Sequence, residues 1–205
     1  MAKVWRGNMR PKWLERAANL LGLPVEPLQR LGVGWSPAHR ATSWPMRDSL
    51  GNVIGVRLRC PKTAKKWAVR GSQAGLIYPL DLSLAEPHRR LVVCEGPTDT
   101  AALLSVGIAA VGVPSAGCGI EHLSDLARRV MPREIVVLAD ADEAGLVGAE
   151  RLASKLIIVA PVRITTPPQG SKDARAWVCS GVDRSLIAAT FDTGPLRTLA
   201  IGSQR

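Results

Sequence analysis

From residue 90 onward, largely apolar stretches alternate with amphipathic ones, and few folds accommodate that alternation. The apolar stretches are typical of buried strands and cover residues 90–94 (RLVVC), 109–113, 134–139 (EIVVLA) and part of 156–164. The amphipathic stretches between them are typical of helices and cover residues 98–106, 120–130 and 144–155. Strands without a polar face are buried on both sides, as in parallel sheets covered by helices. The pattern therefore predicts an α/β fold with a parallel sheet.

The chain before residue 90 is different in texture and strongly basic. Residues 1–90 hold 16 Lys and Arg against 5 Asp and Glu, whereas residues 91–205 hold 11 against 12. A basic module beside a neutral one favours a polyanionic partner such as a nucleic acid, although a solvated basic face with no partner is the simpler alternative.

Helix and turn signals divide this basic part further. They predict helices at 13–21 and 25–31, then a hairpin and one more strand at 43–47, 53–59 and 65–69. We therefore expect a small basic α+β subdomain ahead of the parallel-sheet domain. The expected division of the chain is 1–88, 89–180 and, for a C-terminal helix with a loose tail, 181–205.

Acidic residues follow two of the predicted strands directly. Glu95 ends the first apolar stretch, and Asp140 and Asp142 come after the third. Ligands of open α/β sheets bind beyond the carboxyl ends of the strands, so these acids meet at one edge if the two strands are neighbours. Converging carboxylates repel one another and call for a cation. Oxygen ligands select a hard ion, so we expect Mg²⁺ or Mn²⁺.

Helix capping is the alternative reason for acids at these positions. Asp99 and Asp142 each stand close to the start of a predicted helix, where a carboxylate stabilises the helix end. For Asp99, cap and ligand are equally good interpretations. Glu95 has no such role, because a glycine separates it from the helix. Asp140 and Asp142, one residue apart in extended chain, point the same way.

Four motifs in order then carry a family resemblance. EGPTD at 95–99, VPSAG at 113–117, LADADEAG at 138–145 and PPQGSKDARAW at 167–177 resemble the Toprim domain. The resemblance covers residues 88–180 and implies a Rossmann-like Toprim sheet with flanking helices. It implies catalytic roles for Glu95, Asp140 and Asp142, and adds Asp99 and Asp173 as further metal ligands.

Among Toprim proteins, the basic segment ahead of the domain favours primases. Residues 44–80 resemble the segment before Toprim in DnaG-type and phage or plasmid primases, where an Arg-bearing strand and a Lys-aromatic pair face the active site. The resemblance implies that nucleotide or DNA is bound by Arg57, Arg59, Lys65, Lys66 and Lys172. Trp67 is better explained by packing on the sheet than by stacking on a base.

The expected function is therefore Mg²⁺- or Mn²⁺-dependent synthesis of RNA or mixed primers on single-stranded DNA from NTPs, in phage- or plasmid-type replication. A helicase or a zinc-ribbon protein acting in trans is an expected partner. A Toprim nuclease, and a non-catalytic DNA-binding module acting with a partner, remain the alternatives.

Other classes are disfavoured by what the chain contains. A topoisomerase needs a nucleophilic tyrosine, and the single Tyr78 precedes the Toprim unit. The four cysteines form no CxxC pair, which argues against a zinc site. No apolar run reaches the ~20 residues that cross a bilayer, so we expect a cytoplasmic protein without a membrane partner.

Overall fold

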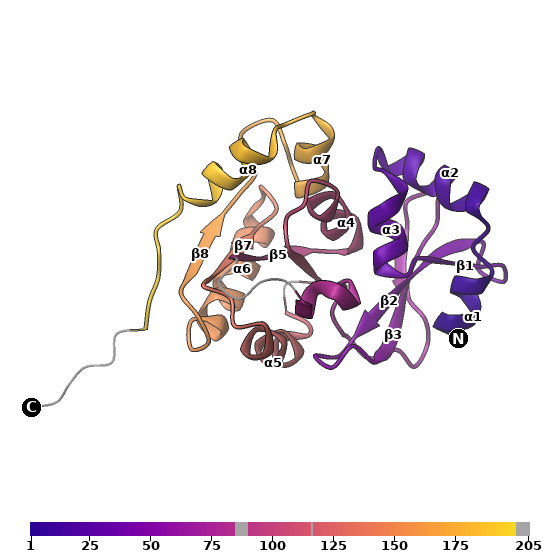
Figure 1. Cartoon of the computed structure of the whole chain (residues 1–205), viewed down its shortest axis with the longest axis horizontal. Helices are drawn as coiled ribbons and strands as arrows, with labels where there is room; N and C mark the ends of the chain where they lie inside the picture. Colours follow the sequence, from indigo (N-terminus) through magenta and orange to yellow (C-terminus); the bar gives the residue numbers. More distant parts are fainter. Residues whose placement is uncertain (85–89, 116, 200–205) are drawn as a thin grey trace, which may run out of the picture.

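A four-stranded antiparallel sheet carries the first part of the chain (Figure 1). The computed structural model describes residues 1–84, 90–115 and 117–199. The strands lie in the order in which they occur: β1 (Gly34–Ser36), β2 (Ala41–Arg47), β3 (Val53–Arg59) and β4 (Lys66–Ala68). Three helices precede them: α1 (Ala2–Gly7), α2 (Pro11–Leu21) and α3 (Val25–Leu31). These elements confirm the predicted helices and hairpin.

The two faces of this first sheet have separate cores. On one face, Trp5 of α1 packs with Val56 and Leu58 of β3. On the other, Trp44 of β2 joins the apolar sides of α2 and α3, represented by Leu14 and Leu28. Trp67 packs against the Trp5 face, which confirms the expected packing role for its indole.

The β2–β3 turn is held by its own side chains. The Asp48 carboxylate accepts hydrogen bonds from the backbone N–H groups of Leu50 and Asn52, both at 2.9 Å. Such a local bond is the reason that Asp favours tight turns. Tyr78 is buried, and its hydroxyl donates to the carbonyl of Asp48 at 2.6 Å. This tyrosine therefore packs against the end of β2.

A second four-stranded sheet, entirely parallel, carries the rest of the described chain. Its order is β6-β5-β7-β8, with bounds β5 (Arg90–Glu95), β6 (Ala110–Val113), β7 (Glu134–Leu138) and β8 (Val162–Thr165). The accompanying helices are α4 (Pro97–Ser105), α5 (Ile120–Val130), α6 (Glu143–Leu156), α7 (Ala174–Cys179) and α8 (Arg184–Phe191). The alternation predicted from residue 90 is confirmed.

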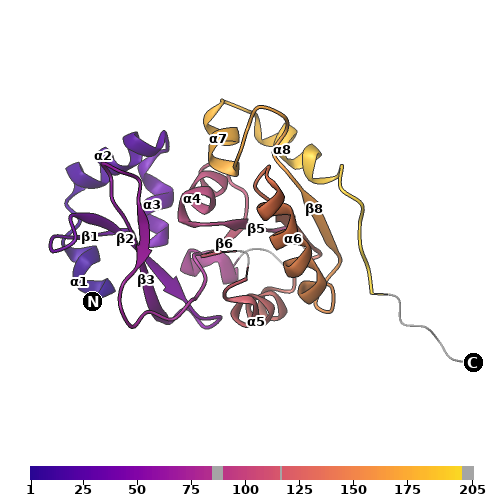
Figure 2. The ribbon, with the colours of Figure 1, turned by 180° about the vertical axis from the view of Figure 1, so that it is seen from behind.

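Helices cover both faces of the parallel sheet (Figures 1 and 2). Val92 and Cys94 of β5 share a core with α4, α7 and α8. Leu91 and Val93, the alternate residues, share the opposite core with α5 and α6. Successive side chains of a strand point to opposite faces, so a strand covered on both sides has no polar position.

A short segment joins the two sheets. Leu76 exchanges two backbone hydrogen bonds of 2.7 Å with Arg47 at the end of β2. Its neighbour Ile77 exchanges two of 2.8 Å with Gly112 of β6. A 3-10 turn, η1 (Leu80–Leu84), follows, and α3 packs against α4. The sheets are therefore linked by backbone hydrogen bonds and by a shared core.

Two expectations concern the ends of these units. The predicted boundary at 88/89 lies in residues 85–89, outside the described residues, and the division into domains stays a prediction. The tail was expected to be loose, but Arg197 exchanges backbone hydrogen bonds with Val162 of β8 and forms a two-contact ion pair with Glu150. The tail is tied here because β8 is an edge strand with unpaired backbone groups. Residues 200–205 lie outside the described part.

In the described part of the chain, none of the helices combines the length and the apolar character needed to cross a membrane.

Candidate functional site

The predicted acids lie at the topological switch point of the parallel sheet, where the strand order reverses between β5 and β7. β5 pairs with β6 on one side and with β7 on the other, so the chain moves outward from the β5–β7 pair both ways. Glu95 ends β5, and Asp140 lies two residues beyond the end of β7. The carboxyl ends at such a switch point form the usual ligand crevice of open α/β sheets. The neighbouring strands therefore bring these two acids to the same edge, as predicted.

Glu95 is exposed and is held in place by the turn that follows it. Gly96 has φ +86° and ψ 165°, a conformation that residues with a Cβ rarely adopt. Its N–H donates to the Val113 carbonyl at 2.8 Å, and its carbonyl accepts from the Thr100 hydroxyl at 2.8 Å. The turn thus fixes the direction in which the strand presents the Glu95 carboxylate.

The loop carrying Asp140 packs closely against the start of α6. A Cβ on Gly145 would lie 2.6 Å from the Asp140 carbonyl oxygen and 3.0 Å from its nitrogen. Only a glycine allows this approach. The N–H of Ala141 donates to the Lys172 carbonyl at 2.9 Å. This bond ties the loop to Lys172 and Asp173, the Lys-Asp segment.

Asp142 is the N-cap of α6, so the capping interpretation holds for it. Its carboxylate accepts the Gly145 N–H at 2.7 Å and satisfies one of the free donors of the first turn. The cap is compatible with a second contact through the other oxygen, and the predicted role as a metal ligand stays a prediction.

Asp99 and Asp173 both serve the start of a helix that the sequence did not predict, α7. Asp173 is its N-cap and accepts the Ala176 N–H at 2.7 Å. Asp99 is buried in the first turn of α4, yet its carboxylate accepts the Arg175 N–H in α7 at 2.9 Å. Asp99 therefore caps a neighbouring helix instead of its own, and this holds the Lys-Asp segment beside the acidic edge.

The electrostatics show that the five acids share one region. Burial raises the pKa of Asp140 to about 7, with further contributions from the charges of Asp99, Glu95, Asp173 and Asp142. Burial also raises the pKa of Asp99 to about 6; the Arg175 N–H opposes that rise, and Asp173 adds to it. Carboxylates that perturb one another in this way are typical of functional sites.

These groups fit a hard divalent cation by their chemistry. A small cavity of about 20 Å³, lined by Glu95, Asp140 and Gly145 among others, lies at the acidic edge. Within the described ranges, no three His, Cys, Asp or Glu side chains are already gathered tightly enough to hold a metal ion. An all-oxygen set of ligands is the kind that Mg²⁺ and Mn²⁺ bind.

The basic residues predicted on the first sheet face this acidic edge. Arg57 and Arg59 of β3 pair with Ala68 and Lys66 of β4, so their side chains share one face. The Lys66 charge lowers the pKa of Asp99 against the larger effect of burial. Burial lowers the pKa of Arg59, and the nearby charge of Arg175 adds to this lowering. The two sheets therefore place cations opposite carboxylates.

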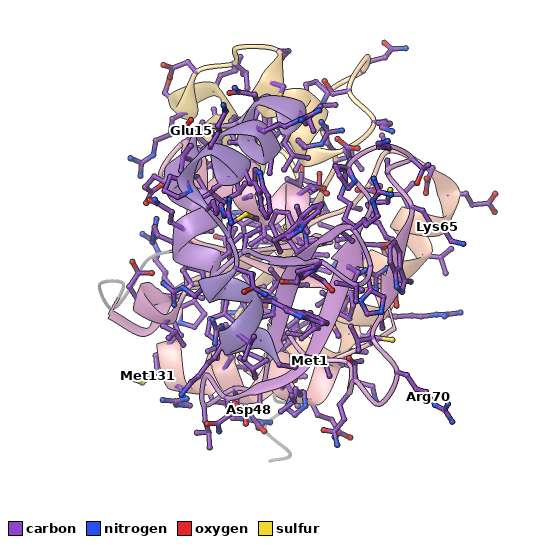
Figure 3. All side chains as sticks on the ribbon, turned by 90° about the vertical axis from the view of Figure 1, so that its right-hand side faces the viewer. Met1, Glu15, Asp48, Lys65, Arg70 and Met131 are labelled. Carbon is purple, nitrogen blue, oxygen red and sulfur yellow. The ribbon has the colours of Figure 1, made fainter. Side chains whose placement is uncertain are left out.

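Two other predicted cations, Lys65 and Lys172, are exposed. Lys65 precedes β4 and is exposed; Figure 3 shows it at the edge of the molecule. The Lys172 side chain is 80 % exposed, and its Nζ lies 3.8 Å from a carboxylate oxygen of Asp173. Neither observation tests the predicted binding role of these lysines.

Two residues at the site were not among the predicted ones. Thr100 braces the Gly96 turn, and Arg175 connects α7 both to Asp99 and, through its side chain, to the Leu21 carbonyl at 3.4 Å. For α7 a signal exists, because an Asp directly before a run of helix-forming residues marks a helix start. For Thr100 the sequence holds no such signal.

The raised pKa of Asp140 predicts how pH affects the metal-free protein. At a pH between 3.8, the ordinary pKa of an aspartate, and about 7, Asp140 holds a proton in the folded protein that it has released in the unfolded chain. Stability should therefore fall as pH rises from about 4 to about 7, by roughly 1–2 kcal/mol after allowance for the partial exposure of this side chain. Urea unfolding in EDTA across this range measures the effect, and Asp140→Asn should flatten the profile. An equal slope in that variant and in Asp125→Asn, a change on α5, would contradict the assignment.

Comparison with known proteins agrees with this architecture. Residues 92–177 match the model of a family described as Toprim-like. A DNA primase of Myxococcus xanthus is 34% identical over 120 residues, which cover 55% of this chain and 20% of that protein. A DNA primase of Mycolicibacterium smegmatis is 33% identical over 129 residues, covering 54% and 20%. The chain thus spans about a fifth of the length of these curated relatives.

Solved structures extend the likeness to both sheets. The structure of the DnaG primase catalytic domain bound to ssDNA has a TM-score of 0.75 at 18% identity, covering 95% of this chain and 76% of that chain. The E. coli primase catalytic core has a TM-score of 0.71 at 19% identity, covering 95% and 78%. Residues 92–177, which carry most of the second sheet, are therefore similar to a Toprim-like domain. Over 95% of its length, the chain has the fold of the DnaG catalytic core.

Proposed function

We propose that this chain is a primase-like nucleotidyltransferase that makes RNA or mixed primers on single-stranded DNA, with Mg²⁺ or Mn²⁺, in phage- or plasmid-type replication. One observation carries the proposal: the acidic edge of the parallel sheet faces the basic face of the antiparallel sheet. The charge of Lys66 lowers the pKa of Asp99, and the charge of Arg175 lowers the pKa of Arg59. A polyanion between the two sheets would meet cations on one side and a cation-binding acidic edge on the other.

Each group has a role in this proposal. Glu95, Asp140 and Asp142 would hold the divalent ion, which when bound aligns substrate phosphates and stabilises developing charge. Arg57, Arg59 and Lys66 would bind template or triphosphate. The Nε atoms of both arginines are buried and have no hydrogen-bond partner in the described part of the chain. The planar guanidinium of an arginine can donate two parallel hydrogen bonds to phosphate oxygens.

Asp99 and Asp173 would hold the start of α7 in place, and their negative charges would add to those of the other acids. Both accept N–H groups at the start of α7, which fixes the Lys-Asp segment and Lys172 next to the acids. A direct role for them at the metal belongs to the same proposal. We further propose that a helicase or a zinc-ribbon protein assists in trans. A fragment of the bacteriophage T7 primase-helicase protein shares the fold, with a TM-score of 0.57.

The experiment that tests this function is incubation of the chain with labelled NTPs, a single-stranded DNA template and Mg²⁺ or Mn²⁺. Labelled oligonucleotides that depend on the template and the metal are the expected result. Shortening of the template without synthesis would replace the proposal with a metal-dependent nuclease. Intact template binding with neither product would leave a non-catalytic DNA-binding module.

Removing the Lys66 charge tests the basic face. Lys66→Ala is expected to weaken binding of single-stranded DNA several-fold and to lower the slope of log affinity against log salt by about 0.7, the value for one phosphate contact. Lys66 is exposed, so folding should be unaffected. Lys3→Ala on α1, at the other face of the first sheet, is the matched control. If log affinity depends on log salt with the same slope in both variants and the unaltered chain, Lys66 does not contact the DNA.

A further inference from the structure

A pocket of about 620 Å³ lies on the first sheet, apart from the acidic edge. Its walls come from α2, from β1, from the β1–β2 turn with the start of β2, and from the β3–β4 turn. Figure 3 shows this side of the molecule, with Glu15 marking α2 and Lys65 marking the β3–β4 turn, both in the upper half of the view. The functional role of the acids leaves this pocket unexplained.

Two tryptophans line the pocket. Trp13 of α2 and Trp35 of β1 have ring centroids 5.5 Å apart, with their planes tilted by 58°. Trp13 is 40% exposed, although burial of so large a side chain would be favourable. The guanidinium of Arg10 lies 5.3 Å from the centre of the Trp13 ring. An exposed aromatic surface with a cation beside it is a good platform for a nucleic-acid base.

The charge of the lining agrees with this. Arg16, Arg40 and Lys62 belong to it, and among the residues that the structure describes no acidic side chain does. Glu15, also on α2, is exposed but outside the lining. Cations around an aromatic platform match a strand in which bases alternate with phosphates.

The strand register connects the pocket to the basic face of the site. Trp35 pairs with Thr42, Thr42 with Arg59, and Arg59 with Lys66. Paired residues of neighbouring strands share a face, so these four form one row across the sheet. Three strand spacings of ~4.8 Å separate its ends by roughly 14 Å. A few nucleotides could therefore reach from the tryptophans to Lys66, which faces the carboxylates.

We propose that the Trp13–Trp35 pocket is a base-stacking subsite for single-stranded DNA. A base stacks on the exposed indole of Trp13, and Arg16, Arg40 and Lys62 bind the flanking phosphates. The strand then continues over Thr42 and Arg59 towards the acidic edge. The proposal rests on the proposed function in taking this strand as the template, but binding at the subsite needs neither metal nor NTP.

The test compares strands with and without bases. Fluorescence anisotropy measures binding of a labelled oligothymidine of about 12 nucleotides, in EDTA and without NTPs, so that failure of primer synthesis leaves the result intact. Trp13→Leu keeps apolar volume but removes the ring, and should weaken binding roughly 5- to 100-fold. On an abasic strand of equal length the variant and the unaltered chain should bind alike. Trp13→Phe should stay within about threefold on both strands.

Two results would overturn the proposal: oligothymidine binding that is unchanged in Trp13→Leu, or an equal loss on both strands. Arg16→Glu gives a second test that does not disturb the tryptophans, because Arg16 is exposed. It should weaken oligothymidine binding at least tenfold more than Arg70→Glu. Arg70 is equally exposed, but Figure 3 shows it in the lower half of the view, away from α2. Equal losses in the two charge-reversal variants would also count against the pocket.

Discussion

Replacing Asp140 by asparagine should reduce templated primer synthesis by about a thousandfold. The change keeps the shape of the side chain but removes a negative charge from the centre of the acidic edge, where all four other acids act on Asp140. Loss of a metal-binding charge costs several kcal/mol of transition-state stabilisation, and each 1.36 kcal/mol is tenfold in rate. Initial rates of labelled NTP incorporation at saturating template measure the effect.

The matched control is Asp125→Asn. Asp125 is exposed on α5, where it forms a 2.9 Å ion pair with Arg128. This variant should synthesise primers at the unaltered rate. Binding of single-stranded DNA should survive in both variants, since the cations lie on the other sheet. Synthesis that is unchanged in Asp140→Asn would place the chemistry elsewhere in the chain.

Replacing Gly145 by alanine is expected to have a large effect at the site. The added methyl would lie 2.6 Å from the Asp140 carbonyl oxygen, so α6 and the Asp140 loop must move apart. Overpacking of this kind costs about 3 kcal/mol. The movement would also displace Asp140 from Glu95. Urea unfolding should show the loss of stability, and primer synthesis should fall in parallel.

Gly7→Ala is the control for the Gly145 change. Gly7 ends α1, and a Cβ there would meet nothing within 4 Å. Its free energy of unfolding should stay within ~0.5 kcal/mol of the unaltered chain. Gly145→Ala with unaltered stability and unaltered synthesis would mean that the close approach of α6 to Asp140 is unimportant.

Much of the parallel-sheet fold was predictable because a strand buried on both faces leaves a simple pattern. LVVC at 91–94 and IVVL at 135–138 have no charged or strongly polar position, and in the structure they lie in the central strands β5 and β7. Their adjacency also places Glu95 and Asp140 together, since acids directly after neighbouring parallel strands must meet at one edge. These inferences needed only local patterns and one general rule of topology.

Contacts between distant segments were not predictable in the same way. The sequence placed Asp99 at the start of its own helix, whereas its carboxylate binds the N–H of Arg175, 76 residues away. The short helix α7 was missed because six residues give little periodicity. The row from Trp35 to Lys66 depends on the register between neighbouring strands. That register is set when the strands pair in the folded sheet, so the sequence alone did not reveal the row.

The central claim is that Glu95 and Asp140 hold a divalent ion at the edge of the parallel sheet. Electron paramagnetic resonance of free Mn²⁺, titrated with the protein above pH 7 and in the presence of NTP, counts bound ions directly. The unaltered chain and Asp125→Asn should bind Mn²⁺ alike, and Glu95→Gln and Asp140→Asn should each lose at least one bound ion. Equal Mn²⁺ binding by all four proteins would contradict the account.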